Sequence, residues 1–485
     1  MISLPSHALR QKIALVSGFV LFFLAWFVNP LQLDTNACRV IAVALLMITW
    51  WITEALPMPA VALIPIVMFP LMGIATISAT TAPYANEVIF LFMGGFMIGL
   101  GIEKWNLHKR IALSIIKVTG TSGNRIILGF ILATGFISMW LSNTATTMMM
   151  FPIALSVIKV IGGEGKDSKG MRNFSLCLML AIAYSSNFGG LATIIGTPPN
   201  VAYVSYISRK FNYEISFFNW MLICLPISLM LMIGLYTVTV KFLFPNGLSS
   251  SVEMHDMIAR ELRDLGPLSS AEKRVLVIFV CTALLWITRD LINSLRLIRL
   301  DDNMIAIFGA LLMFIVPSGV KEKDHKLLEW RDTKNMAWGI LLLFGGGITL
   351  ANAMEKAGLM EMLGQWIASF SGSNVLLLLI VVTTVSIFIS EVMSNIAQVI
   401  VFAPVVTSIA EAAGINPFIL GIAMTLAASC ASMMPMGTPP NAIVFASGHI
   451  RIQQMMKAGF VMNIISIILI VLFCYFLLPS LLFIK

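Results

Sequence analysis

Residues 141–146, Leu-Ser-Asn-Thr-Ala-Thr, form a short polar stretch inside a long apolar run, and residues 393–398, Met-Ser-Asn-Ile-Ala-Gln, form a second one 252 residues later. Each is followed by the same five residues, Gly-Thr-Pro-Pro-Asn, at 196–200 and at 437–441. Polar side chains and paired prolines are costly in apolar surroundings unless they line a cavity. Because the costly pattern occurs twice in the same order, it predicts two half-sites that face one binding pocket.

The composition is that of a membrane protein. Of the 485 residues, 59% are hydrophobic and 11% are charged, whereas soluble domains carry roughly 25% charged residues. Long apolar runs recur from end to end without the alternation of barrel strands. The first run follows Arg10 and Lys12 without a clear cleavage site, so we expect a retained first helix and a cytoplasmic N-terminus. The sequence predicts an all-α, multi-pass protein of the cell (inner) membrane, with the lipid bilayer as a partner.

Charge and cysteine content exclude other classes. The net charge is +8, but the lysines and arginines lie mainly in loops between apolar runs, as the positive-inside rule describes. We therefore expect no nucleic-acid partner. The six cysteines are scattered singly, with no Cys-x-x-Cys pair, which supports neither a disulfide framework nor a zinc site.

Further matches follow the offset of 252. Leu-Phe-Met-Gly-Gly at 91–95 corresponds to Leu-Phe-Gly-Gly-Gly at 343–347, and Glu-Lys at 103–104 to Glu-Lys at 355–356. The Gly-Thr-Pro-Pro-Asn segments are 241 residues apart, and a polar insert near 162–172 accounts for the difference. Several matches in one order indicate an internal duplication.

The loop charges predict that the two copies are inverted. Lysine and arginine are frequent around the first polar motif, at 104–125 and 159–172, whereas Lys356 stands alone in the corresponding segments around the second, near 356–374 and 411–416. The first pair of loops is therefore expected in the cytoplasm and the second outside. Five cations lie on the other side and depart from this pattern: Arg209, Lys210, Arg289, Arg296 and Arg299.

The run 126–160 is too long for one helix across a bilayer. As a single helix it would measure roughly 50 Å, whereas the hydrocarbon core is ~30 Å thick. Its polar motif lies near the middle, and the same holds for the run 375–411. We expect two re-entrant hairpins whose tips approach the middle of the membrane. The two prolines of each Gly-Thr-Pro-Pro-Asn segment should likewise break a helix and expose backbone carbonyls.

The residue types of these motifs suit a cation and a carboxylate together. Hydroxyl, amide and freed backbone oxygens can coordinate sodium, while amide donors and helix N-termini can hold a carboxylate. No lysine or arginine lies between 126 and 158 or between 173 and 208, and Lys356 is the single one between 336 and 450. An anion would therefore depend on bound sodium for positive charge, which is the mutual dependence that a symporter needs.

The Trp-Leu-Ser-Asn-Thr-Ala-Thr-Thr stretch at 140–147 and both Gly-Thr-Pro-Pro-Asn segments resemble those of the divalent anion–sodium symporter family, which includes sodium-coupled dicarboxylate and citrate transporters. The resemblance spans essentially the whole chain. It implies a homodimer in which a scaffold supports a transport domain that moves as an elevator. It also implies cotransport of sodium ions with C4-dicarboxylates such as succinate, or with citrate.

By this resemblance the chain divides into five parts. They are the scaffold helices of the first repeat (1–120), the first hairpin, broken helix and following helix (121–245), a cytoplasmic linker (246–274), the scaffold helices of the second repeat (275–372), and the second hairpin, broken helix and last helix (373–485).

The resemblance also implies the ligands. One sodium ion would be held by Ser138, Ser142, Asn143 and the carbonyl of Gly196, and a second by Ser390, the carbonyl of Met393, Asn395 and the carbonyl of Gly437. The substrate carboxylates would meet Ser142, Asn143, Thr144, Ser394 and Asn395, with Thr197, Pro198, Thr438 and Pro439 completing the pocket.

Two residues near the second motif remain open. Ile396 stands where a second Thr would give a perfect repeat, so a hydroxyl is lost and an apolar wall gained. Glu391 lies three residues before Ser394. It could tune the second cation site, carry a proton or hydrogen-bond to the hairpin backbone.

Other functions fit less well. A sodium-independent dicarboxylate or tricarboxylate exchanger on the same fold is the nearest alternative. An intramembrane enzyme would need a nucleophile beside a base, yet the runs that hold the Ser-Asn pairs contain no histidine. A passive anion channel would not accumulate its substrate against a gradient.

Overall fold

The computed structural model describes residues 7–29, 33–162, 169–248, 252–296, 298–320, 326–360, 362 and 374–481. The core of the polar insert, residues 163–168, lies outside these ranges. Nine helices among the described residues are long and apolar enough to cross a membrane. In chain order the elements are α1 (His7–Phe23), η1 (Leu24–Val28), α2 (Thr35–Thr53), α3 (Met58–Val61), α4 (Ile64–Leu71), α5 (Ile77–Thr81), η2 (Ala82–Ala85), α6 (Glu87–Lys104), α7 (Leu107–Thr119), α8 (Gly123–Ser138), α9 (Asn143–Gly162), α10 (Lys169–Gly190), α11 (Pro198–Phe211), α12 (Phe217–Tyr236), η3 (Thr237–Leu243), α13 (Val252–Asp264), α14 (Ser270–Ser294), α15 (Asp302–Ile315), η4 (Trp330–Asn335), α16 (Trp338–Lys356), α18 (Val375–Ser390), α19 (Asn395–Ala412), α20 (Pro417–Ala428), α21 (Pro439–Phe445), α22 (Ile452–Leu472), η5 (Phe473–Leu477) and α23 (Leu478–Leu481).

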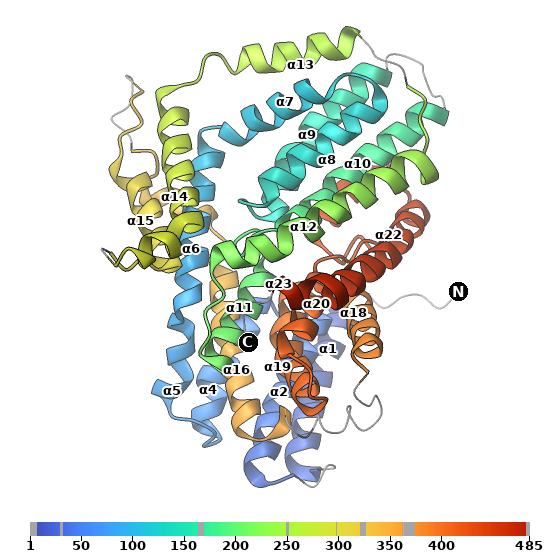
Figure 1. The fold of residues 1–485 in the computed structure, drawn as a ribbon. Coiled ribbons are helices and arrows are strands. Elements are labelled where there is room, and N and C mark those ends of the chain that lie inside the picture. The colour runs from blue at the N-terminus through green and yellow to red at the C-terminus, as the bar shows by residue number, and fades with distance from the viewer. Residues whose placement is uncertain are drawn as a thin grey trace.

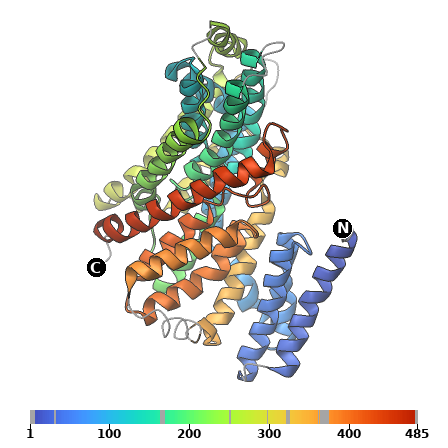
Figure 2. The ribbon, with the colours of Figure 1, turned by 90° about the vertical axis from the view of Figure 1, so that its right-hand side faces the viewer.

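The helices fall into two packed sets, each built from two separate parts of the chain. Set A comprises the helices of residues 7–104 and 270–356, in which α1 packs on α2, α6 on α15, and α16 on α2. Set B comprises those of residues 107–243 and 375–481, in which α7 packs on α8, α8 on α10, α18 on α20, and α12 on α22. Figure 2 shows α1 and α2 in blue at one side of the orange and red helices of set B. Each set thus joins a segment of the first half to one of the second.

Both long apolar runs are interrupted at their Ser-Asn motifs. Helix α8 ends at Ser138 and α9 begins at Asn143, while α18 ends at Ser390 and α19 begins at Asn395. The arms α8 and α18 have 16 residues each. At 1.5 Å per residue each is about 24 Å long, less than the ~30 Å hydrocarbon core. The breaks lie where the sequence predicts hairpin turns, and α8 and α9 lie side by side in Figure 1.

The Gly-Thr-Pro-Pro-Asn segments mark two further breaks. Helix α10 ends at Gly190 and α11 begins at Pro198, while α20 ends at Ala428 and α21 begins at Pro439. The prolines occupy the first turn of α11 and of α21, where no N–H donor is needed and a fixed φ favours the helix. Between the paired helices the backbone is unwound, which leaves its carbonyls and amides available.

The repeated glycine pairs lie where helices approach closely. A Cβ on Gly94 of α6 would come within 2.6 Å of the backbone of Ala306 in α15, and one on Gly346 of α16 would overlap the backbone of Ala62. Their neighbours in sequence, Gly95 and Gly347, face set B instead, against Ile195 and Ile400 respectively. In each copy, one glycine therefore packs within set A and the next meets set B.

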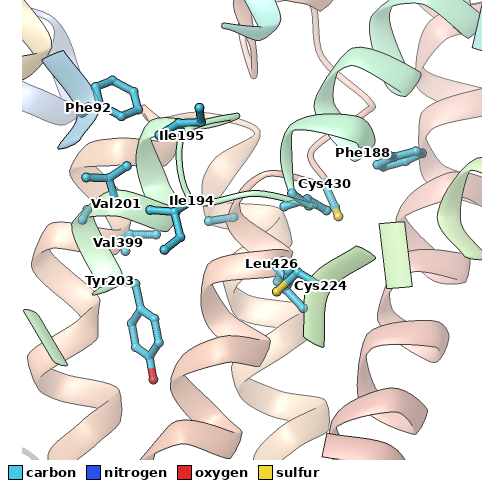
Figure 3. Close-up of a cluster of buried hydrophobic side chains, with 14 of the residues drawn as sticks. Phe92, Phe188, Ile194, Ile195, Val201, Tyr203, Cys224, Val399, Leu426 and Cys430 are labelled. Atoms are coloured by element: carbon cyan, nitrogen blue, oxygen red, sulfur yellow. The ribbon is translucent and has the colours of Figure 1, made fainter. Parts of the chain in front are cut away.

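An apolar contact joins the two sets beside the unwound segment after α10. Ile194 and Ile195 of that segment are buried, as is Phe92 of α6. The close-up in Figure 3 shows Ile195 lying toward Phe92, with Val201 and Val399 both on one side of Ile194. Burial of these large side chains fixes the position of the unwound segment against set A.

Polar contacts also join the two sets. Lys210 Nζ at the end of α11 lies 2.5 Å from Glu355 Oε1 of α16. The backbone N–H of Phe217 donates to Asp302 Oδ2 at 2.7 Å, and the Phe217 ring stacks on that of Trp286 with centroids 4.5 Å apart. Lys210, one of the cations that depart from the predicted charge pattern, is thus paired with an acid.

The charged segment predicted as a linker, 246–274, contains a helix that the sequence analysis did not identify. Helix α13 lies over α7, as Figure 1 shows, and Lys109 Nζ is 2.8 Å from Glu261 Oε2. Arg110 Nε is 2.8 Å from Glu272 Oε1 at the start of α14, and the same guanidinium donates to the carbonyls of Leu265 and Gly266. The segment is therefore fastened to α7.

Candidate functional site

Oxygen atoms converge where the first hairpin turn meets the end of α10. Ser138 Oγ lies 2.8 Å from Asn143 Oδ1 and donates to the carbonyl of Ser186 at 2.7 Å. In this amide orientation Asn143 Oδ1 also faces the carbonyl of Gly196; in the reverse one its nitrogen would donate to the same oxygens. The Ser138 hydroxyl is the one hydrogen-bond donor among these oxygens. A hard cation favours such a group of carbonyl and hydroxyl oxygens. The structure thus brings together three of the residues predicted for the first sodium ion, Ser138, Asn143 and Gly196, and adds Ser186.

Two glycines make this oxygen cluster possible. A Cβ on Gly190 would overlap Asn143 Oδ1 and lie 3.2 Å from the carbonyl oxygen of Gly196. A Cβ on Gly196 would lie 2.5 Å from the carbonyl oxygen of Gly190 and 3.0 Å from that of Ser138. Because only glycine leaves this space free, the backbone oxygens of both helix ends can approach the asparagine.

The second hairpin repeats part of the arrangement. Ser390 Oγ lies 2.5 Å from Asn395 Oδ1 and donates to the carbonyl of Ala428 at the end of α20. Ser390 and Ala428 therefore occupy the places that Ser138 and Ser186 have in the first half. Met393 lies in the turn with its side chain buried. Gly437 lies against Glu391, since a Cβ on it would be 3.0 Å from Glu391 Oε2.

Glu391 holds the unwound segment after α20. Its Oε1 accepts from the backbone amides of Ser432 and Met433 at 2.9 Å and from Asn463 Nδ2 at 2.7 Å, and its Oε2 accepts from the amide of Met434 at 2.9 Å. The side chain is buried. Of the roles left open for Glu391, these contacts match a hydrogen-bonding one, but with the broken helix rather than the hairpin: the carboxylate satisfies amides that unwinding left without helical partners.

A chain of polar side chains links the two halves. Asn143 Nδ2 lies 3.4 Å from Asn187 Oδ1 and 3.5 Å from Thr197 Oγ1, and Asn187 Nδ2 donates to Thr438 Oγ1 at 3.1 Å. Tyr184, one turn earlier on α10, donates its hydroxyl to the carbonyl of Ser432 at 2.7 Å. The first half-site and the second unwound segment are therefore in direct contact.

The other residues predicted to bind substrate lie around these clusters. Ser142, Thr144, Pro198, Ser394 and Ile396 are half-buried, Thr197 and Thr438 are buried, and Pro439 is exposed. Ser142 Oγ accepts from the amide of Ala145 at 3.3 Å, so its hydroxyl proton is available to a ligand. The half-buried hairpin tips can contact both the protein and a small solute.

Sequence reasoning missed Ser186, Asn187 and Asn463. Residues 185–187, Ser-Ser-Asn, form a polar run inside the apolar helix α10, and this run was the signal that could have identified the first two. Asn463 lies in an apolar helix without a polar neighbour on either side, so its role with Glu391 follows from the fold alone.

Comparison with known proteins gives matches along nearly the whole chain. The model of the family described as "Sodium:sulfate symporter transmembrane region" matches residues 9–483. A sodium-dependent dicarboxylate transporter, SdcS, of Staphylococcus saprophyticus is 38% identical over 484 residues, which cover 98% of this chain and 93% of that protein. SdcS of Staphylococcus aureus strain USA300 is 40% identical over 476 residues, covering 97% and 91%.

Solved structures with similar folds are also transporters. Neisseria gonorrhoeae MtrF, described among antimetabolite efflux pumps, gives a TM-score of 0.54 at 13% identity and covers 85% of this chain and 84% of its own. The Alcanivorax borkumensis YdaH transporter gives 0.53 at 12% identity, covering 91% and 98%. These two comparisons support the fold alone. The family match over 9–483 and the relatives more than 30% identical along nearly the whole chain show that the chain is a multi-pass membrane transporter, not an enzyme, and that it belongs to the sodium:sulfate symporter family of sodium-coupled transporters.

Proposed function

We propose that the protein is a sodium-coupled symporter that carries C4-dicarboxylates of the succinate type into the cytoplasm. The observation that carries this proposal is the oxygen cluster around Asn143, where Ser138 Oγ and the carbonyls of Ser186 and Gly196 meet one amide oxygen. The dicarboxylate class is favoured by relatives named as sodium-dependent dicarboxylate transporters.

Coupling follows from the charges. The stretches that form both hairpin turns and both unwound segments contain no lysine or arginine. A dianion at the hairpin tips therefore gains positive charge mainly from the cations bound beside it, and each cation gains from the dianion. Such reciprocal stabilisation is a coupling free energy between the two sites.

The proposal also covers the movement of the pocket, the orientation of the chain in the membrane and the oligomeric state. Set B would act as the transport domain and slide against set A, the scaffold, in an elevator movement. The two halves would insert into the cell membrane as inverted repeats with the N-terminus in the cytoplasm, and two chains would form a homodimer. The division of the helices into two packed sets, each drawing on both halves of the chain, supports this arrangement.

Uptake of labelled succinate into proteoliposomes tests the coupling. With an inward sodium gradient we expect uptake to exceed that in potassium by at least about tenfold, because coupling free energies of 1–3 kcal/mol correspond to factors of roughly 5–150. Uptake that requires internal dicarboxylate but ignores sodium would instead establish the exchanger. Equal uptake under all gradients would contradict both the symporter and the exchanger. Competition by malate, citrate and sulfate in the same assay ranks the substrate classes.

A cross-link between the two sets tests the elevator movement. Lys210→Cys and Glu355→Cys, on α11 and α16, place two thiols where the side chains now meet. We expect a short bifunctional thiosulfonate, which forms a disulfide with each cysteine and releases sulfinate, to stop uptake, because set B could no longer slide along set A. Cys281, the exposed native cysteine, is replaced by serine in this background.

A second cysteine pair is the control for this experiment. Asn246 Nδ2 donates to Asn124 Oδ1 at 2.8 Å; Asn124 lies in the first turn of α8 and Asn246 shortly after η3, and both helices belong to set B. Asn124→Cys with Asn246→Cys should react equally well and leave uptake intact. Undiminished uptake by a fully cross-linked Lys210→Cys/Glu355→Cys protein would exclude sliding between α11 and α16.

A further inference from the structure

The Asn143 amide can face the oxygen cluster in either of two orientations. With its oxygen toward the cluster, Nδ2 points to Asn187 and Thr197. Turned over, the nitrogen would donate to Ser186 O at 3.0 Å, Gly196 O at 3.3 Å and Ser138 Oγ at 2.8 Å. A cation favours the first orientation because it needs an oxygen, whereas a cluster without a cation favours the second because it offers acceptors only. Sodium binding therefore decides which atom Asn143 presents to Asn187.

Asn187 transmits that choice because it has one donor group and one acceptor atom in a fixed place. Its side chain is 2% exposed, it faces Asn143 through Oδ1, and it donates to Thr438 Oγ1 through Nδ2. If Asn143 turned its oxygen toward Asn187, the Asn187 amide would have to turn as well to supply a donor. It would then present its oxygen to Thr438.

The orientation of the Asn187 amide decides whether the Thr438 hydroxyl can donate to a ligand in the proposed substrate pocket. Its Oγ1 accepts from Asn187 Nδ2 and from the backbone amide of Asn441. With both acceptor positions used, the hydroxyl proton is free to donate to a carboxylate. If Asn187 instead presented its oxygen, the Thr438 hydroxyl would donate to it and the carboxylate would lose a donor.

We propose that Asn187 is a positioning residue that couples cation binding at Asn143 to substrate binding at Thr438 by reversing the direction of the hydrogen bonds between them. This inference rests on the proposed sodium-coupled transport. It adds a residue outside the repeated motifs and a mechanism beyond direct charge attraction. Sodium at the first cluster makes Thr438 a donor to the substrate, and substrate at Thr438 favours the Asn143 orientation that binds sodium.

In the part of the second half that the structure describes, no residue could act as Asn187 does. Ser138 and Ser390 donate to the carbonyls of Ser186 and Ala428, so the residues that follow, Asn187 and Ser429, hold corresponding places. The buried hydroxyl of Ser429 has no hydrogen-bond partner among the described residues, and it is too short to span the distance that Asn187 covers. We therefore expect the reversing chain to run from the first cation cluster only.

Binding measurements on the purified, full-length protein test the proposal. In Asn187→Leu, which keeps the volume and removes the hydrogen bonds, sodium alone should still stabilise the protein against heating with a midpoint concentration within about twofold of the wild type. The factor by which saturating sodium tightens succinate binding should fall about tenfold, within the usual range of coupling factors. Thr438→Val should reduce that factor similarly. The double variant should lose little more, because both changes break one chain.

The outcomes separate the possible failures. Wild-type protein that binds succinate equally with and without sodium would refute the proposed function itself. A wild-type coupling factor in Asn187→Leu, or additive losses in the double variant, would overturn the relay while leaving the symporter intact. Ser185→Ala is the matched control, since Ser185 is buried on the same helix and its hydroxyl bonds within that helix. It should keep the full coupling factor. Thr438→Ser, which retains the hydroxyl, should preserve most of it.

Discussion

Asn143→Ala is expected to abolish sodium-dependent uptake while leaving the amount of protein in the membrane unchanged. The change removes the amide oxygen around which Ser138 Oγ and the carbonyls of Ser186 and Gly196 are gathered. The remaining oxygens cannot close around a cation without it. Loss of one contact to a charged ion, worth about 3 kcal/mol, corresponds to a loss of affinity of more than 100-fold.

Initial rates of labelled succinate uptake, normalised to the protein in the vesicles, measure this effect. Asn395→Ala should behave alike, because Asn395 Oδ1 meets Ser390 Oγ in the second hairpin. Asn173→Ala is the matched control, since that asparagine lies at the start of α10 and donates to the carbonyl of Pro245. Near-normal uptake by Asn143→Ala or Asn395→Ala would contradict the assigned roles.

Glu391→Leu is expected to destabilise the protein by about 4 kcal/mol or more and to eliminate uptake. The carboxylate accepts from three backbone amides and from Asn463 Nδ2, and each buried donor left unpaired costs about 1–3 kcal/mol. Glu391→Gln should be intermediate. Its oxygen can serve Ser432, Met433 and Asn463, but its NH₂ group would face the N–H of Met434.

The midpoint of thermal unfolding in detergent, read together with uptake, orders these variants. We expect wild type to be most stable, followed by Glu391→Gln and then Glu391→Leu. Glu411→Gln near the exposed end of α19 provides a control for the loss of a carboxylate and should behave as wild type. A Glu391→Leu protein with a wild-type midpoint but altered sodium dependence would show that the carboxylate acts on the cation rather than on the backbone.

The interruptions of the helices could be predicted from the sequence because each carries a local physical signal. The prolines at 198 and 439 forbid a continuous helix, and the polar residues at 142–144 would be costly on an apolar helix surface. Duplication strengthened both signals. These breaks place Ser138 beside Asn143, but Ser138 and the carbonyl of Gly196 were predicted as ligands from the family resemblance.

The remaining features depend on atoms that the sequence does not distinguish. Asn187 has Ser429 at the corresponding place in the second half, so a search for repeats passes over it. The partners of Glu391 include three backbone amides, which exist at nearly every position and become available only where α20 unwinds. Helix α13 was missed because its charged residues suit a solvated loop as well as a helix held by Lys109 and Arg110 on α7.

The second glycine of each pair, Gly95 and Gly347, leaves space on α6 and α16 for the side chains of Ile195 and Ile400. Interdigitated side chains would have to disengage each time one surface travelled past the other, and every such ridge would add to the activation barrier. A glycine has no side chain that would have to disengage. If set B slides against set A as proposed, these two glycine positions would lower the barrier to that movement, while substrate binding would remain at the hairpin tips.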